Sequence, residues 1–310
     1  PPWNELIIYE MHIGTFNPMS EERVGTFQRA ARKLSYLRTL GINAVQIMPP
    51  MEFPGGRSWG YNPALPFAVE TDYGGMLGFK QFVKAAHGHG ISVILDVVYN
   101  HLGPGDLDLW RFDGWWEEDG GGIYFYNDRR SETPWGHTRP DYGRPEVRQM
   151  LRDNALMWLH EYKVDGLRWD ATAYIRNIYG NDNEPANDLP DGWSLMQWIN
   201  EEVHEQEPNN LTIAEDLRNN EWLVKDTGAG GAGFGSQWDA NFVHPIRTAI
   251  ISSDDAFRDM KAVKKALIFK YGGDVFKRVV YTESHDEVAN GKARVPEEIW
   301  PGNSHNWFAK

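Results

Sequence analysis

The feature that most constrains the fold is a regular alternation of short apolar segments with longer amphipathic ones. The apolar runs are typical of strands and span residues 6–13, 42–48, 91–99, 163–169, 211–215 and 276–282, with a weaker run at 235–242. Apolar residues at helical spacing fill the gaps between them, at 27–40, 78–89, 147–158, 194–206 and 255–271. Strands that alternate with helices are parallel and joined by crossover helices. The pattern therefore predicts an α/β fold, either an open doubly wound sheet or a closed barrel.

Length and composition exclude several classes of protein. The chain has 310 residues, of which 41% are hydrophobic and 24% charged, and no apolar run approaches the ~18 residues that would suggest a membrane span. A net charge of −13 repels phosphate backbones, so we expect neither nucleic acid nor membrane as a partner. The absence of Cys excludes disulfides and thiolate chemistry. The first residues carry no export signal, so we expect a cytoplasmic protein.

One glycine-rich stretch has the residue spacing of a nucleotide-binding motif. The segment GAGGAG at residues 228–233 has the spacing G-x-G-x-x-G, but it follows a polar segment and does not open a helix. A phosphate-cradling loop needs a buried strand before it and a helix after it. We therefore interpret the stretch as a flexible loop and consider a nucleotide-dependent enzyme improbable.

Arg168 and Asp170 are two residues apart at the end of one predicted strand. Alternate residues of a strand point to the same face, so both side chains should face the same way. Burying a charged pair in the interior costs several kcal/mol of stability unless both side chains have hydrogen-bond or ion-pair partners. Taken alone, the pair is explained as well by a structural ion pair as by a functional site.

Ionisable residues recur at the ends of four predicted strands, which favours the functional interpretation. They are Asp96, His101, Arg168, Asp170, Glu215, Asp216, His285 and Asp286. In a barrel enzyme the loops after the strands surround a single mouth, where the active site lies. A structural explanation serves for one such strand end but is strained for all of them together.

The segments at these strand ends resemble those of the α-amylase superfamily, glycoside hydrolase family 13. They read DVVYNH (residues 96–101), GLRWDA (166–171), IAED (213–216) and SHDE (284–287), in the order of the family. The resemblance covers nearly the whole chain and implies a (β/α)8 TIM barrel. Few residues follow the last segment, so we expect a barrel truncated before strand 8, with one catalytic domain at residues 1–310. A small aromatic-rich insertion is expected at about residues 102–143, whose rings we expect mainly to pack against one another.

The resemblance also implies roles for individual residues. Asp170 would be the nucleophile, Glu215 the general acid/base, and Asp286 a third carboxylate that helps hold and distort the sugar. Five further residues would line the same subsite: Tyr61, Asp96, His101, Arg168 and His285. No cofactor is expected. Asn100 stands where many amylases bind calcium, but the sequence does not identify the other ligands, so we predict no metal.

These roles agree with the chemistry of a retaining glycosidase. Such an enzyme needs one ionised carboxylate to attack the anomeric carbon and one protonated carboxyl to release the leaving oxygen. Arg168 would pair with the charged carboxylate of Asp170. Glu215, at an apolar strand end near other carboxylates, should have a raised pKa.

The expected substrate is a starch- or glycogen-like α-1,4-glucan, but two reactions remain open. The stretches YTESHDEVANGK (residues 281–292) and TIAED (212–216) resemble those of 1,4-α-glucan branching enzymes, which is our leading interpretation. In contrast, DVVYNHLGP (96–104) and QWDANF (237–242) resemble those of amylase-type hydrolases, including maltooligosyltrehalose trehalohydrolases. A non-catalytic glucan-binding protein is less expected, because all three carboxylates are present.

Overall fold

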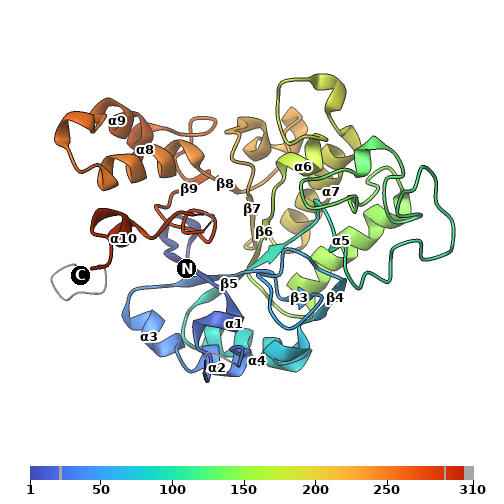
Figure 1. The fold of residues 1–310 in the computed structure, drawn as a ribbon, viewed down its shortest axis with the longest axis horizontal. Coiled ribbons are helices and arrows are strands. Elements are labelled where there is room, and N and C mark those ends of the chain that lie inside the picture. The colour runs from blue at the N-terminus through green and yellow to red at the C-terminus, as the bar shows by residue number, and fades with distance from the viewer. Residues whose placement is uncertain (21–22, 290, 304–310) are drawn as a thin grey trace.

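A parallel sheet forms the centre of the computed structural model, which describes residues 1–20, 23–289 and 291–303. Within these residues the sheet contains seven strands, which curl into a half-barrel (Figure 1). In spatial order they are β1 (Ile8–Met11), β2 (Ala44–Ile47), β5 (Ser92–Val97), β6 (Gly166–Trp169), β7 (Leu211–Ala214), β8 (Ser236–Trp238) and β9 (Arg278–Val279). Every neighbouring pair is parallel. The parallel strands and the curvature of the sheet confirm the predicted barrel architecture.

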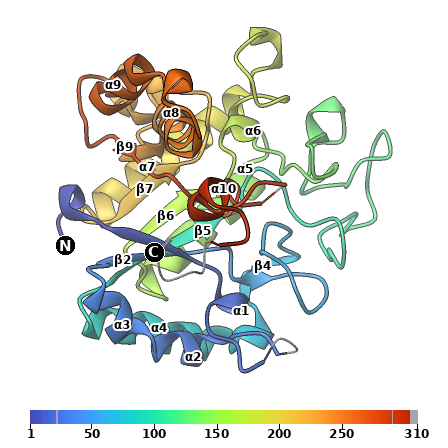
Figure 2. The same cartoon turned by 60° about the vertical axis from the view of Figure 1, so that its left-hand side comes forward.

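Helices connect most of the consecutive strands and cover the outside of the sheet, whereas β7 and β8 are joined by two short 3-10 turns, Glu221–Val224 and Thr227–Ala229. Those of eight or more residues are α4 (Gly75–Gly88), α5 (Pro145–His160), α7 (Pro190–Gln206), α8 (Ala240–Ile251) and α9 (Met260–Ile268). The shorter ones are α1 (Ile13–Phe16), α2 (Phe27–Ala31), α3 (Leu34–Thr39), α6 (Ala173–Arg176) and α10 (Val295–Ile299). Helices α2, α3 and α4 lie together at one end of the molecule and α8 and α9 at the other (Figures 1 and 2). A two-stranded antiparallel hairpin, β3 (Met51–Glu52) and β4 (Leu65–Val69), follows β2.

Several predicted elements differ from the structure: the strands predicted at residues 6–13 and 276–282 are shorter, as β1 and β9, and three further elements have other boundaries. The helix predicted over residues 27–40 is broken into α2 and α3. The strand predicted over residues 235–242 ends at Trp238, because Asp239 caps a helix that the sequence did not indicate: its side chain accepts a hydrogen bond from the Asn241 N–H. The helix predicted from residue 255 begins at Met260, where Asp259 accepts hydrogen bonds from two backbone N–H groups. In both cases a capping aspartate, rather than the apolar pattern, sets the boundary.

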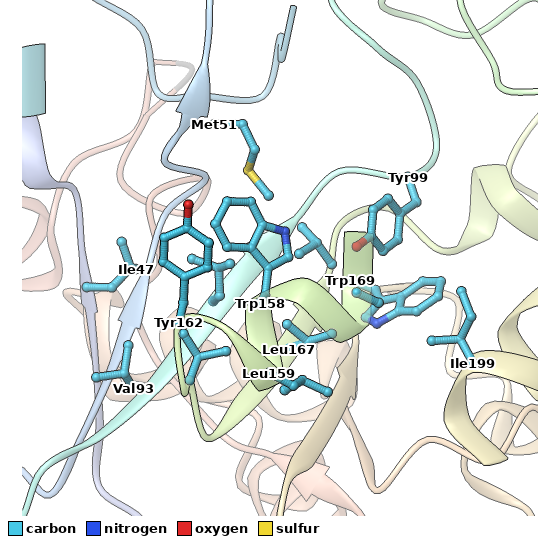
Figure 3. Packing of buried hydrophobic residues seen from close by; sticks show 14 of the residues in the cluster. Ile47, Met51, Val93, Tyr99, Trp158, Leu159, Tyr162, Leu167, Trp169 and Ile199 are labelled. Atoms are coloured by element: carbon cyan, nitrogen blue, oxygen red, sulfur yellow. The ribbon is translucent and has the colours of Figure 1, made fainter. Parts of the chain in front are cut away.

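The main hydrophobic core lies between the sheet and its outer helices (Figure 3). Leu167 and Trp169 of β6 pack there against Trp158 of α5 and Ile199 of α7, and all four are buried. Arg168, between the two β6 residues, points to the opposite face of the sheet. This alternation places a fully buried charge inside the half-barrel.

The segment after β5 has a small apolar cluster of its own. Leu102, Leu107 and Phe125 are buried together, with Trp110 packed against them. Arg139 is fully buried and donates hydrogen bonds to the backbone carbonyls of residues 130, 132 and 178. Most of these contacts stay within residues 102–143, although their treatment as a separate insertion stays a prediction.

The glycine-rich stretch at residues 228–233 leads into β8 and not into a helix. Its backbone is held by hydrogen bonds from the Ala232 N–H to the Trp222 carbonyl and from the Gly233 N–H to the Lys225 carbonyl. Asn200 of α7 also donates to the Ala232 carbonyl. The prediction of a loop is confirmed, and these bonds tie it to its surroundings; its flexibility stays a prediction.

The two outermost strands of the sheet, β1 and β9, leave a cavity of about 490 Å³ between them. Only a few contacts bridge this side, among them the hydrogen bond from Trp3 Nε1 to the Phe276 carbonyl at 2.7 Å. None of the helices in the described part of the chain is long and apolar enough to cross a membrane.

Candidate active site

The guanidinium of Arg168 is the centre of a buried charge cluster at the carboxyl ends of three strands. Its Nη1 donates to both carboxylate oxygens of Asp96 at 2.8 Å and to Oδ1 of Asp170 at 2.9 Å. Its Nη2 lies 3.6 Å from Oε2 of Glu215. One cation therefore contacts three carboxylates.

The sheet register explains why these side chains meet. Asp96 on β5 is the register partner of Arg168 on β6, so their side chains lie next to each other on the inner face. Asp170 follows two residues later on that face, and Glu215 comes directly after β7, the next strand. Parallel neighbouring strands thus carry all four groups to one end of the half-barrel.

Hydrogen bonds from the turn after β6 and from Asn100 position the carboxylates of Glu215 and Asp170. The Ala171 N–H donates to Oε2 of Glu215 at 2.6 Å, and Asn100 Nδ2 donates to Oδ2 of Asp170 at 3.2 Å. Ala171 has a φ of +41°, a conformation that non-glycine residues seldom adopt. This strained residue aims its N–H across the site and fixes the position of the Glu215 carboxyl.

Burial and neighbouring charges shift the protonation of the cluster. Burial raises the pKa of Glu215 to about 7, with Asp170 and Asp286 adding to the shift and Arg168 and the Ala171 N–H opposing it. This is the direction that the sequence predicted. Burial also raises the pKa of Asp96 above its ordinary value, although Arg168 opposes it. At neutral pH the site can therefore hold a protonated Glu215 close to an Arg168-bound Asp170.

A second group of side chains connects β1 and the loop after β9 to this cluster. The Tyr61 hydroxyl donates to Oδ2 of Asp96 at 2.7 Å, and its ring stacks on His285 with 5.0 Å between centroids. Nε2 of His285 lies 3.5 Å from Oδ1 of Asp286, whose side chain is half exposed. Glu10, on β1, accepts hydrogen bonds from His285 on the other side.

His101 lies deeper than the other predicted residues. It is only 1% exposed, and its ring is stacked at 4.7 Å under Trp135, an exposed residue of the segment after β5. Burial lowers the pKa of His101, while Asp170 opposes the shift. Trp135 therefore covers His101, so not all aromatic residues of that segment serve its internal packing.

All eight predicted site residues gather at this end of the sheet, and the structure adds three that sequence reasoning missed. These are Glu10, the backbone of Ala171, and Trp238, whose ring lies 4.4 Å from the Arg168 guanidinium. A carboxylate inside the apolar run YEMHI could have indicated Glu10. No comparable signal marks Ala171, because its role depends on backbone conformation.

The described residues contain no cluster of three or more His, Asp or Glu side chains arranged to hold a metal ion. Asn100, which the resemblance connects with calcium, uses its amide nitrogen on Asp170, and its buried Oδ1 has no hydrogen-bond partner. The expectation that Asn100 binds no metal stays a prediction.

Comparisons with known proteins agree with this geometry. Residues 12–109 match the family described as alpha amylase, catalytic domain. The chain is 35% identical to a malto-oligosyltrehalose trehalohydrolase of Saccharolobus solfataricus and 33% identical to a 1,4-alpha-glucan branching enzyme GlgB of Pseudoalteromonas atlantica. These alignments cover 92% and 94% of this chain, but 50% and 41% of those proteins. The chain thus spans about half the length of these relatives or less.

A solved structure gives the same result for the fold. A Salmonella typhimurium protein assigned as an alpha amylase superposes with a TM-score of 0.73 and 30% sequence identity. The superposition covers 94% of this chain and 50% of that one.

Proposed function

Because the chain belongs to the α-amylase superfamily, glycoside hydrolase family 13, we propose that it carries the active site of a retaining enzyme that cleaves α-1,4-glucosidic bonds of starch- or glycogen-like glucans. The observation that carries the proposal is the single guanidinium of Arg168 between the carboxylates of Asp170 and Glu215. That arrangement places one ionised and one protonatable carboxyl close together, and the retaining mechanism needs two such groups to flank the scissile bond.

In the first step, Asp170 attacks the anomeric carbon while Glu215 gives its proton to the departing glycosidic oxygen. The bond to the leaving sugar breaks, and a covalent ester forms between the glycosyl group and Asp170. In the second step, the acceptor hydroxyl loses its proton to Glu215 and displaces Asp170. The raised pKa of Glu215 suits it to both halves of this cycle.

The remaining predicted residues serve the sugar bound next to Asp170. Asp286 is exposed enough to reach sugar hydroxyls, and His285 beside it offers Nε2. Tyr61 supplies an aromatic ring held by its hydrogen bond to Asp96. Asp96 and Arg168 are fully buried, so they act by holding Tyr61 and Asp170, whereas His101 lies beneath Trp135.

The acceptor in the second step distinguishes two reactions. We keep the branching reaction as the leading proposal, in which the 6-hydroxyl of another glucan attacks and an α-1,6 bond forms. Its support is the segment at residues 281–292 and the similarity to branching enzymes. Hydrolysis by water is the second candidate, supported by the similarity to a trehalohydrolase, which at 35% identity is slightly higher than the 33% to the branching enzyme. A glucan partner and a cytoplasmic location remain part of this proposal.

Product analysis on amylose separates the two reactions. We expect the enzyme to lower the iodine colour with few new reducing ends and to produce α-1,6 linkages visible by NMR. If reducing ends rise in step with the loss of colour and no α-1,6 signal appears, the enzyme is a hydrolase. If amylose is not changed at all while nucleotide binding is found by calorimetry, the proposal as a whole fails.

The pKa of Glu215 predicts a pH dependence. The free enzyme must carry a protonated Glu215 to start the reaction, and this form is lost as the pH rises through about 7. We expect kcat/KM to be high below that pH and to fall above it. A profile that already falls near pH 5, close to an unperturbed Glu, would contradict this assignment.

A further inference from the structure

Glu10 and His285 form a partly buried pair across the gap between the first and last strands of the half-barrel. Both hydrogen bonds converge on one carboxylate: the His285 backbone N–H donates to Oε2 at 2.7 Å, and ring Nδ1 lies 2.8 Å from Oε1. Gln46 of β2 approaches Oε1 more weakly, at 3.4 Å. The strongest hydrogen bonds of the carboxylate are therefore those with His285.

The orientation of the imidazole follows from this pairing. With Nδ1 bound to Glu10, the other ring nitrogen, Nε2, is turned toward Asp286 at 3.5 Å and toward the opening of the site. Tyr61 stacks on the ring face at 5.0 Å and Trp59 approaches its edge at 5.4 Å. A carboxylate that accepts a hydrogen bond from one ring nitrogen keeps that nitrogen protonated, so the other nitrogen carries a proton only when the ring is an imidazolium.

We propose that Glu10 is a positioning residue that keeps His285 as an imidazolium with its Nε2–H directed at a hydroxyl of the sugar held by Asp286. This inference rests on the proposed function and adds a residue to it. A charged donor at that position stabilises negative charge that develops on the substrate more strongly than a neutral one. Glu10 therefore acts on the reaction through His285 and touches no substrate itself.

The electrostatic surroundings agree with this role. Burial by itself lowers the pKa of His285, but Glu10 and Asp286 outweigh burial and the opposing charge of Arg168, so the net pKa is raised. Burial alone would raise the pKa of Glu10, yet its bonds to His285 bring it below the usual value. His12 and Tyr61 are the other titratable groups near the ring. Of all these groups, Glu10 alone bonds to the imidazole ring at normal hydrogen-bond distance.

The test is Glu10→Gln, which keeps the shape of the side chain but removes its charge. We expect the His285 ring resonances in NMR, assigned by their loss in His285→Gln, to titrate at least about one pH unit lower than in the unaltered protein. We expect kcat/KM on amylose near pH 7.5 to fall at least about tenfold and the deficit to shrink toward pH 5.5, where the imidazolium forms without help. Glu5→Gln, an exposed change just before the same strand, should alter neither measurement.

Two outcomes would overturn the inference. One is an unchanged His285 titration in Glu10→Gln. The other is a loss of activity that is equal at every pH. A merely structural role would lower kcat/KM without shifting the pH at which kcat/KM falls on the alkaline side of its profile. Glu215 titrates on the same limb, so the NMR titration decides which group has shifted.

A double variant separates this inference from the proposed function. In a His285→Gln background, Glu10→Gln should cost little further activity, because its effect passes through the imidazole. An additive loss would contradict the pairing. If Asp170→Asn retains full activity, the proposed function fails, and the His285 titration still tests the inference about Glu10.

Discussion

Replacement of Asp170 by Asn is expected to lower kcat on amylose at least about 1,000-fold, because it removes the attacking charge. Asn has nearly the same volume and can still accept a hydrogen bond from Arg168, which keeps both bonds to Asp96. Binding of a maltooligosaccharide, measured by calorimetry, should therefore change little. The expected loss of kcat therefore arises in the chemical step and not in substrate binding.

A matched control is Asp108→Asn, an exposed carboxylate in the segment after β5. It makes the same chemical change and should leave the activity at its starting value. If Asp170→Asn keeps activity within about tenfold of the unaltered protein, Asp170 does not have the role of nucleophile.

Replacement of Arg168 by Met is expected to lower the free energy of unfolding by about 3 to 5 kcal/mol, besides removing activity. Arg168 is fully buried and is the cation that Asp96 and Asp170 both contact. Without it their charges remain buried and unpaired, which costs far more than the lost contacts themselves. Urea denaturation at neutral pH measures the effect. Arg32→Met, on an exposed part of the chain, should change stability by less than about 0.5 kcal/mol.

The destabilisation should itself depend on pH. In Arg168→Met, Asp96 and Glu215 lose the cation that opposes the effect of their burial, so their pKa in the folded state rises further above that in the unfolded state. The folded variant then binds more protons, and its stability is greater at low pH and lost as the pH rises. The deficit relative to the unaltered protein should be smaller near pH 5 than near pH 8. A deficit that does not change with pH would show that lost packing, and not unpaired charge, explains it.

The sequence predicted the barrel and the charge cluster because both depend on local patterns. The period of two along the strand at residues 163–169 places Arg168 and Asp170 on one face, and parallel strand order brings Glu215 beside them. Such inferences need only the direction of each strand and the order of the strands.

What the sequence did not predict depends on contacts between distant segments or on backbone conformation. Glu10 on β1 contacts His285 near the other end of the chain only because the sheet curls. The sequence pattern of a single strand does not indicate how the sheet as a whole curves. The left-handed conformation of Ala171 is set by its surroundings, since Ala carries no preference for it. The start of α8 depended on Asp239, whose capping bond outweighed the apolar alternation around Trp238.

The most direct test of the central claim is to trap the glycosyl-enzyme. In Glu215→Gln the second step lacks its base, while an α-maltosyl fluoride can still react because fluoride leaves without a proton. Peptide mass spectrometry of the quenched mixture should find one maltosyl group, joined as an ester to Asp170. A label on any other residue, or turnover without a label at Asp170 in that variant, would contradict the proposed double-displacement mechanism.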